Sequence, residues 1–245
     1  MSGPAGRGEA RADTAGIDVA GLDVVIDGAA ILEDVTVSLT QRRVAVIGAN
    51  GSGKSTFART LNGLVRPTRG TVRVAGVDVG ARPRQAREAV GFLFTNPDAQ
   101  VLMPTPEEDV ALSLRTAGVP RRDRAERARA ELARFGLAGR ATQPAHSLSG
   151  GQKQLLALAA VLASRPRVLI ADEPTTLLDL GNARRMADLL IDGDERGPVA
   201  EQIVIVTHDL ELAARCDVAL RFAEGRLVEA GEPAVVVDRY RREFA

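Results

Sequence analysis

The sequence predicts an α/β fold, a core of strands and helices that is interrupted by a mainly helical insert. A short apolar strand, 43–47, leads through a glycine-rich loop into a stretch with the apolar spacing of a helix. A second apolar strand, 168–171, ends in paired carboxylates. Between about residues 95 and 150, helical segments bounded by prolines replace the strands. These three observations carry the assignment of the fold class.

The composition is that of an ordinary soluble globular protein, with 45% hydrophobic and 26% charged residues in a chain of 245. The longest apolar run, Leu155–Ala163, is far shorter than the roughly 20 residues of a membrane-spanning helix. The formal net charge of +0 argues against a nucleic-acid binder with a broad basic surface. A single cysteine, Cys216, excludes an internal disulfide and suits a reducing compartment. We therefore expect a cytosolic protein whose membrane role, if any, comes through a partner.

The first part of the chain reads as a tail followed by short strands. Residues 1–16 are rich in glycine, alanine and arginine and lack the apolar region of a secretory signal, so we expect a disordered tail. Elements are then predicted as strands 22–26, 35–39 and 44–47, helix 57–64, a turn at 66–70, a hairpin of 71–74 and 77–79, helix 83–89 and strand 90–94.

The middle of the chain is predicted to be helical, with helices at 107–117 and 121–135. Acidic residues lie between the arginines of the second helix, which indicates a solvated helix face rather than a nucleic-acid patch. A third helix, 150–163, is almost wholly apolar past Gln154 and should be buried.

The last part returns to alternating strands and helices. We expect strands at 168–171 and 203–206 around a helix at 182–190, and a closing pair of strands at 218–222 and 226–229. The expected division of the chain is a tail 1–16, a first core part with a β subdomain 17–94, a helical subdomain 95–150, a second core part 151–232, and a C-terminal helix or tail 233–245.

The glycine-rich loop has the phosphate-binding pattern of glycine, four residues, glycine, lysine, and serine or threonine. Its glycines let successive amides point into one concavity, to which the next helix adds its positive N-terminal end. Lys54, one of only two lysines, would lie near the outer phosphates, and the Ser55 hydroxyl is placed to ligate Mg²⁺. The residues expected to bind nucleotide are Gly48, Ala49, Asn50, Gly51, Ser52, Gly53, Lys54, Ser55 and Thr56.

A second candidate anion site opens the buried helix at Leu148–Gln152. Ser149 is a good N-cap, and Gly150 and Gly151 leave the first amides of the helix uncovered before Gln152. Taken alone, the same residues are equally consistent with a plain helix cap.

Two carboxylates and a histidine follow apolar strands. Asp172, at the end of its strand, is expected to hold Mg²⁺, and Glu173 to polarise an attacking water. The alternative is an acidic turn before Pro174. His208, after the strand 203–206, fits a residue that contacts the outer phosphate, whereas His146 is assigned no role.

Taken together, these motifs resemble the ATP-binding cassette family over about residues 17–232. The resemblance implies a RecA-like P-loop core with an antiparallel β subdomain and an inserted helical subdomain. It also implies a head-to-tail dimer with ATP and Mg²⁺ between the Walker A loop of one subunit and the signature of the other. The matching segments are Gly48–Thr56 (Walker A), Leu148–Gln152 (signature), Val168–Glu173 (Walker B with the catalytic glutamate), Asp179 (D-loop) and His208 (switch histidine).

The chain departs from this family's pattern in three places. Residues 1–56 contain no aromatic residue, so the adenine is expected to rest on aliphatic side chains such as Val25 or Ile26. Thr95, in the Q-loop region that also contains Gln100, replaces the glutamine that usually ligates Mg²⁺. The D-loop has Thr176 and Leu177 in place of serine and alanine.

Residues 94–110 resemble the ATPase subunits of energy-coupling factor (ECF) importers of vitamins and metal ions. Phe94–Asp98 and Met103–Thr105 are most similar to the biotin type, with the cobalt and nickel types as the alternative. The partners implied are a second ATPase subunit, in a homodimer, together with an ECF transmembrane coupling protein and a substrate-binding membrane protein. The chain would then lie on the inner face of the cell membrane. A non-transport member acting on nucleic acid or ribosomes is the rival hypothesis, and the chain shows no second cassette or basic extension to favour it.

Overall fold

The computed structural model describes residues 16–243, so the predicted tail lies, except for Gly16, outside the described residues. The strands are β1 (Ile17–Ile26), β2 (Ala29–Leu39), β3 (Arg43–Gly48), β4 (Arg69–Val74), β5 (Val77–Asp78), β6 (Val90–Leu93), β7 (Val168–Asp172), β8 (Gln202–Val206), β9 (Val218–Ala223) and β10 (Arg226–Gly231). The α-helices are α1 (Lys54–Leu61), α2 (Pro83–Ala89), α3 (Pro106–Thr116), α4 (Arg121–Arg134), α5 (Gly150–Ala163), α6 (Leu180–Ile191), α7 (Leu210–Ala214) and α8 (Pro233–Arg242), and the 3₁₀ turns are η1 (Pro97–Ala99), η2 (Ala138–Arg140) and η3 (Ala145–Ser147).

The central sheet has six strands in the order β10-β9-β3-β8-β7-β6. Its pairs are parallel except for β9 and β10, which run antiparallel. Strands β6, β7 and β8 are buried at every residue, which explains their continuous apolar sequences. Side chains alternate along β3, so that Val44 and Val46 enter one hydrophobic cluster while Ala45 and Ile47 enter the other.

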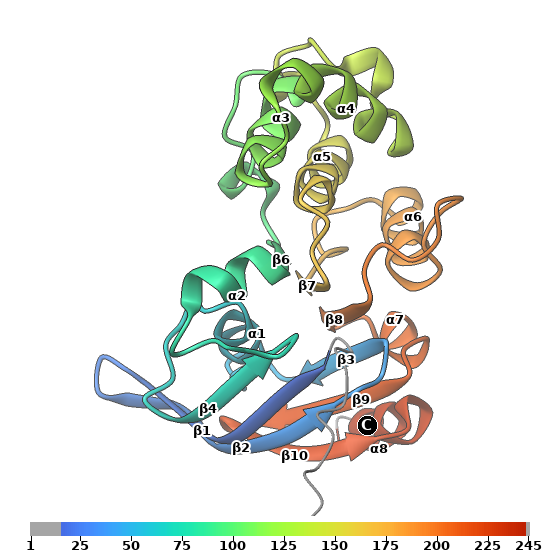
Figure 1. The fold of residues 1–245 in the computed structure, drawn as a ribbon. Coiled ribbons are helices and arrows are strands. Elements are labelled where there is room, and N and C mark those ends of the chain that lie inside the picture. Colours follow the sequence, from blue (N-terminus) through green and yellow to red (C-terminus); the bar gives the residue numbers. More distant parts are fainter. Residues whose placement is uncertain (1–15, 244–245) are drawn as a thin grey trace, which may run out of the picture.

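The first cluster lies between the central sheet and a smaller antiparallel sheet, β2-β1-β4-β5. It includes Leu22 and Leu32 from the small sheet, Phe57 of α1, and Phe222 of β9. The rings of Phe57 and Phe222 lie 5.0 Å apart, centroid to centroid. Figure 1 shows β1, β2 and β4 beside the strands of the core, with α1 behind them. This packing fixes α1 at the end of β3, where the glycine-rich loop joins them.

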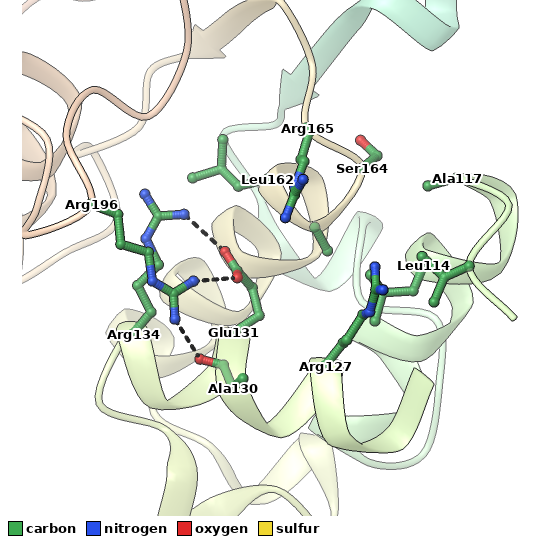
Figure 2. Close-up of a pocket in the computed structure, with 12 residues that line it drawn as sticks. Leu114, Ala117, Arg127, Ala130, Glu131, Arg134, Leu162, Ser164, Arg165 and Arg196 are labelled. Atoms are coloured by element: carbon green, nitrogen blue, oxygen red, sulfur yellow. Dashed lines mark hydrogen bonds and ion pairs between the residues drawn. The ribbon is translucent and has the colours of Figure 1, made fainter. Parts of the chain in front are cut away.

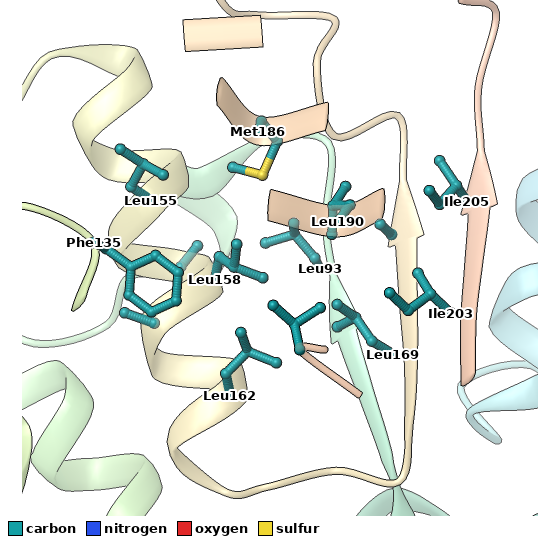
Figure 3. Close-up of a cluster of buried hydrophobic side chains, with 14 of the residues drawn as sticks. Leu93, Phe135, Leu155, Leu158, Leu162, Leu169, Met186, Leu190, Ile203 and Ile205 are labelled. Atoms are coloured by element: carbon teal, nitrogen blue, oxygen red, sulfur yellow. The ribbon is translucent and has the colours of Figure 1, made fainter. Parts of the chain in front are cut away.

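The second cluster covers the opposite face of the central sheet and extends into the helical layer (Figure 1). Helix α5 is buried along nearly its whole length. Figure 3 shows Leu155, Leu158 and Leu162 of this helix between Phe135, at the end of α4, and the side chains of the sheet and α6. Because α3 and α4 also pack on α5, the helical layer is joined to the core mainly through this helix.

Most predicted elements are present, with shifted ends. Helix α3 starts at Pro106 because Thr105 and Glu108 form a capping box. Helix α7 was not predicted, because a helix of five residues is too short to show the periodic spacing of apolar residues. Strand β4 begins at Arg69, inside the predicted turn 66–70, because it pairs there with Asp23 of β1. Within residues 16–243, none of the helices combines the length and the hydropathy that a membrane-spanning segment requires.

Candidate active site

The glycine-rich loop connects β3 to α1 and owes its shape to two crowded glycines. Gly48 has φ +147°, and a Cβ there would lie 2.2 Å from the Phe222 carbonyl oxygen. Gly53 has φ +98°, and a Cβ there would lie 2.7 Å from Cδ2 of Leu32. Any larger residue would push the loop away from the strands beneath it. The loop leads directly into the first turn of α1. The first amides of a helix have no intrahelical hydrogen-bond partners, so they are free to bind a ligand.

Lys54 is the first residue of α1, and its side chain lies under the loop. Its Nζ donates hydrogen bonds of 2.8 Å to the carbonyl oxygens of both Gly48 and Ala49. Burial lowers the pKa of this ammonium group, while the nearby charges of Glu173 and Asp172 act in the opposite direction. The Ser52 hydroxyl is buried with no hydrogen-bond partner among the described residues. A lysine and an unpaired hydroxyl beneath free amides form a cradle that suits a phosphate chain.

Ser55 and Asp172 meet at the end of β7. The Ser55 hydroxyl donates a 2.9 Å hydrogen bond to Oδ1 of Asp172, whose side chain is only 2% exposed. Oδ2 of Asp172 lies 3.7 Å from a guanidinium nitrogen of Arg59. Hydroxyl and carboxylate oxygens are the ligands that Mg²⁺ prefers when it also binds substrate phosphates. The residues present therefore fit a magnesium ion.

Glu173 is held above this pair in an unusual backbone conformation. Its φ is +53°, which is rare outside glycine and costs about 1 kcal/mol or more. The Thr176 hydroxyl donates a 2.9 Å bond to Oε2 of Glu173, and Nε2 of His208 lies 3.2 Å from Oε1. The backbone amide of Glu173 bonds to the Val206 carbonyl, which continues the pairing of β7 with β8. The backbone of Glu173 and the Thr176 hydroxyl thus position the carboxylate, and the His208 ring lies beside it.

Lys54, Ser55, Glu173 and His208 open onto one pocket of about 510 Å³ at the carboxyl ends of the strands, whereas the buried Asp172 is not among its lining residues. It is lined by Ile31, Asn50, Gly51, Ser52, Gly53, Lys54, Ser55, Thr56, Glu173, Thr176 and His208. Of the aliphatic residues ahead of the loop, Ile31 lines the pocket, whereas the predicted Val25 and Ile26 do not and are 46% and 41% exposed. Ile31 was missed because strand alternation alone does not show which residue lies beside the loop.

The Q-loop region divides into two roles. The Thr95 hydroxyl donates a 2.8 Å bond to the main-chain oxygen of Asp172, so this residue contacts the end of β7 through the backbone. Gln100 instead turns back on β6, where its amide bonds to the Phe92 oxygen and the Phe94 nitrogen at 3.1 Å each. The structure thus places Gln100 as a brace for the edge strand, away from the pocket lining.

The signature segment forms a capped helix start on α5. Ser149 accepts the amide of Gln152 at 3.4 Å and Gln152 accepts the amide of Ser149 at 3.0 Å, a capping box. Gly151 serves packing, because a Cβ there would lie 2.6 Å from the Asn182 side chain. Asn182 in turn donates a 2.6 Å bond to Asp179, the N-cap of α6. Hydrogen bonds from Asn182 hold the pKa of Asp179 below its ordinary value.

Two residues that the motifs did not indicate connect the signature helix to the Q-loop region. Lys153 forms a 2.6 Å ion pair with Asp98, and the buried Gln154 donates a 3.1 Å bond to the Phe94 oxygen. Neither pairing can be inferred from the sequence, since the partners are more than 50 residues apart.

The two predicted anion sites do not meet within one chain. None of Ser149, Gly150, Gly151 and Gln152 lines the pocket that holds the glycine-rich loop. Ser149 and Gly150 are instead exposed at the start of α5.

A protein-family model described as ABC transporter matches residues 32–176. The chain belongs to the ABC transporter family. This ABC cassette is 44% identical over 211 residues to the biotin transport ATP-binding protein BioM of Rhizobium etli, covering 86% of this chain and 91% of that protein. It is 40% identical over 210 residues to the energy-coupling factor transporter ATP-binding protein EcfA1 of Enterococcus faecalis, covering 84% and 74% respectively.

Solved structures of ABC cassettes confirm the fold. The cbiO1 protein of Clostridium perfringens, described as part of the ABC transporter complex cbiONQ, matches with a TM-score of 0.80 at 29% identity and covers 95% of this chain and 94% of its own. The cassette MJ0796, in a dimeric post-hydrolysis state bound to ADP and Pi, matches with a TM-score of 0.77 at 26% identity, covering 89% and 98%. The chain is therefore an ABC ATPase with the expected RecA-like core, antiparallel β subdomain and helical subdomain.

Proposed function

We propose that this ABC ATPase is the ATP-hydrolysing subunit of an ECF-type importer that takes up a vitamin, biotin, through a separate membrane permease. The observation that carries the hydrolytic part is Glu173, whose carboxylate is aimed by Thr176 and His208 beside the Ser55–Asp172 pair. The ECF and biotin assignments are supported by the relatives named EcfA1 and BioM, and by the likeness of residues 94–110 to ECF subunits.

The catalytic roles follow from where each side chain lies. Lys54 and the loop amides bind the β- and γ-phosphates of ATP, and Ser55 and Asp172 hold Mg²⁺. When bound, Mg²⁺ supplies neutralising charge to the transferring phosphoryl group. Glu173 accepts a hydrogen bond from the attacking water and orients it, while His208 steadies Glu173 and contacts the γ-phosphate. Thr95 borders the Mg²⁺ position through its contact with Asp172.

A second copy of the chain completes each site. The exposed Ser149 and Gly150, at the positive end of α5, would cap the triphosphate bound to the partner, with Asp179 on the same face. Both motif sets are intact in one chain, which supports a homodimer with two composite ATP sites.

The membrane permease would dock beside the Q-loop region. A groove of about 320 Å³ is lined by Asp98, Val101, Leu102, Met103, Pro104, Ala145, His146 and Lys153. Leu102 is 72% exposed, which is unusual for a large apolar side chain. The Lys153–Asp98 pair links this groove directly to the signature helix, so movement at one would reach the other. This docking would place the subunit on the inner face of the cell membrane.

Two substitutions test the chemistry. Glu173→Gln keeps the size of the side chain but removes its basicity, and should lower ATP turnover by roughly 10²- to 10⁴-fold while ATP still binds. Lys54→Ala should abolish measurable ATP binding at concentrations that saturate the parent protein. If Glu173→Gln hydrolysed ATP at the parent rate, Glu173 would not be the residue that orients the attacking water.

The transported substrate is tested in cells. Deleting the chain should abolish high-affinity uptake of biotin, and restoring the parent chain, but not Glu173→Gln, should recover it. Loss of cobalt or nickel uptake with normal biotin uptake would favour the metal-ion type instead. Purification with ribosomes or DNA, and not with two small membrane proteins, would contradict the importer.

A further inference from the structure

A separate pocket of about 570 Å³ lies where the helical layer meets the core. It is bounded by the ends of α3 and α5, by one face of α4, and by the turn that carries Arg196 (Figure 2). Arg165 precedes β7, whereas Asp172 ends it, so this pocket lies near the amino end of that strand and the nucleotide site at its carboxyl end. Along α5, whose 14 residues extend roughly 21 Å, it is also at the far end from the signature.

Part of the charge in this pocket is already paired. Glu131 bonds to Arg134 at 2.9 Å and to Arg196 at 3.1 Å, and Arg134 also bonds to Asp194. The side chains of Glu131, Arg134 and Asp194 are each 15% exposed or less. This network fixes the wall of the pocket and leaves Arg134 and Arg196 balanced by two carboxylates.

Two further arginines line the same pocket and, in the part of the chain that the structure describes, form no ion pair with a carboxylate. Arg127, on α4, and Arg165, in the turn after α5, form no ion pair or side-chain hydrogen bond within residues 16–243. In Figure 2 they extend from different elements toward the middle of the pocket, apart from the network around Glu131. The apolar part of the lining includes Leu114, Val119 and Leu162.

The electrostatic balance favours an anion. Arg127 and Arg165 contribute two positive charges that no side chain compensates. The C-terminal ends of α3 and α5 oppose them with about half a negative charge each. The net charge that remains is positive, and guanidinium groups suit a phosphate because they donate paired N–H hydrogen bonds to it. The volume is within the range of small-molecule sites.

We propose that this pocket, named here the arginine pocket after Arg127, Arg134, Arg165 and Arg196, binds the phosphate group of an amphipathic phosphomonoester, with the apolar part of the ligand against the apolar lining residues Leu114, Val119 and Leu162. The ligand is distinct from the ATP of the proposed function. Arg127 belongs to the helical layer and Arg165 to the turn that enters the core, so the bound phosphate ties these two parts together.

Isothermal titration calorimetry with phenyl phosphate tests this site, with the nucleotide site saturated beforehand by a non-hydrolysable MgATP analogue. The parent protein should bind with a millimolar or tighter dissociation constant, and Arg127→Gln/Arg165→Gln should bind at least about tenfold more weakly. The matched control, Arg121→Gln/Arg122→Gln, removes the same charge from the exposed start of α4 and should bind as the parent does.

A second experiment, flotation with vesicles that contain phosphatidic acid, a phosphomonoester lipid, distinguishes a lipid headgroup from a soluble source of the phosphate. Binding of phenyl phosphate that depends on Arg127 and Arg165 supports a soluble ligand, and vesicle binding with the same dependence supports a lipid headgroup. The proposal is overturned if the parent binds neither probe, or if both double variants weaken binding equally. ATP turnover of the same variants is measured in parallel, so that failure of this site is distinguished from failure of the ATPase assignment.

Discussion

At the scale of single residues, Glu173 shows how the backbone and the side chains share the task of aiming a carboxylate. Its φ is positive. The Thr176 hydroxyl and the His208 backbone amide donate to Oε2, and Nε2 of His208 lies 3.2 Å from Oε1 without forming a hydrogen bond. Strained backbone conformations are common at catalytic positions, and they persist because contacts with the surrounding structure hold them in place. Here the constraint on the backbone is the bond between the Glu173 amide and β8.

Thr176 is predicted to position Glu173. Thr176→Val keeps the shape of the side chain but removes the hydrogen bond, and should lower kcat by about tenfold with little change in KM, since a hydrogen bond to a charged group contributes about 1.5 kcal/mol. Thr176→Ser retains the hydroxyl and serves as the control. Steady-state ATPase assays give both constants. Equal loss in the valine and serine variants would show that the hydroxyl has no positioning role.

At the scale of elements, the start of α3 depends on a buried carboxylate. Oδ1 of Asp109 accepts the amides of Leu102 and Met103 at 2.8 and 3.0 Å, and so holds the segment that presents Leu102. The side chain is only 4% exposed. Burial raises the pKa of this carboxyl, and the two amide bonds offset the rise only in part.

This raised pKa predicts a pH dependence of stability. Between the ordinary value of 3.8 and the higher value in the folded protein, the folded state binds more protons at Asp109 than the unfolded state, so this residue's contribution to the free energy of unfolding falls as the pH rises through that range. Asp109→Asn keeps an oxygen for both amides and cannot ionise. Urea denaturation from pH 4 to 7 should therefore show the parent losing stability relative to this variant as the pH rises. A difference that is independent of pH would contradict the assignment to Asp109.

The elements and motifs were predictable where local chemistry dictates them. The strand, glycine-rich loop and helix at 43–64, and the strand ending in Asp172 and Glu173, occur where the residue pattern indicated. What escaped prediction depends on contacts between distant segments. Gly151 was assigned to uncovering amides, but its environment is set by Asn182, and Gln100 was assigned to the Q-loop although it folds back onto β6. Such pairings follow from the packing of α5 and η1 and leave no periodic signal in the sequence.

At the scale of the whole molecule, the two candidate anion-binding helix ends, the starts of α1 and α5, do not open onto the same pocket within a single chain. This separation indicates that a second copy of the chain completes the site. The loop at α1 opens onto the pocket, while the start of α5 faces solvent with Ser149 and Gly150 exposed. The Gly151–Asn182–Asp179 contacts hold this exposed face together. A head-to-tail pair would bring two such faces onto two pockets.

Crosslinking tests this pairing. Burial raises the pKa of the Cys216 thiol to about 12, so the native cysteine should not react with a maleimide. Any crosslink should therefore involve the introduced cysteines alone. In a Glu173→Gln background with MgATP, a chain carrying Asn50→Cys and Ser149→Cys should form a covalent dimer with a short bis-maleimide. Each single-cysteine chain, treated in the same way, is the control. A bridge formed only within one polypeptide would rule out the head-to-tail arrangement.

The brace formed by Gln100 also bears on solubility. Strand β6 is at the edge of the central sheet, and an open edge offers free amides and carbonyls to any other strand. The amide group of Gln100 occupies the Phe92 oxygen and the Phe94 nitrogen, and Gln154 donates to the Phe94 oxygen. Asn62 likewise donates to the Val90 oxygen. Side chains thus occupy main-chain groups that another strand would need, so we expect this strand to resist pairing with a strand of another molecule.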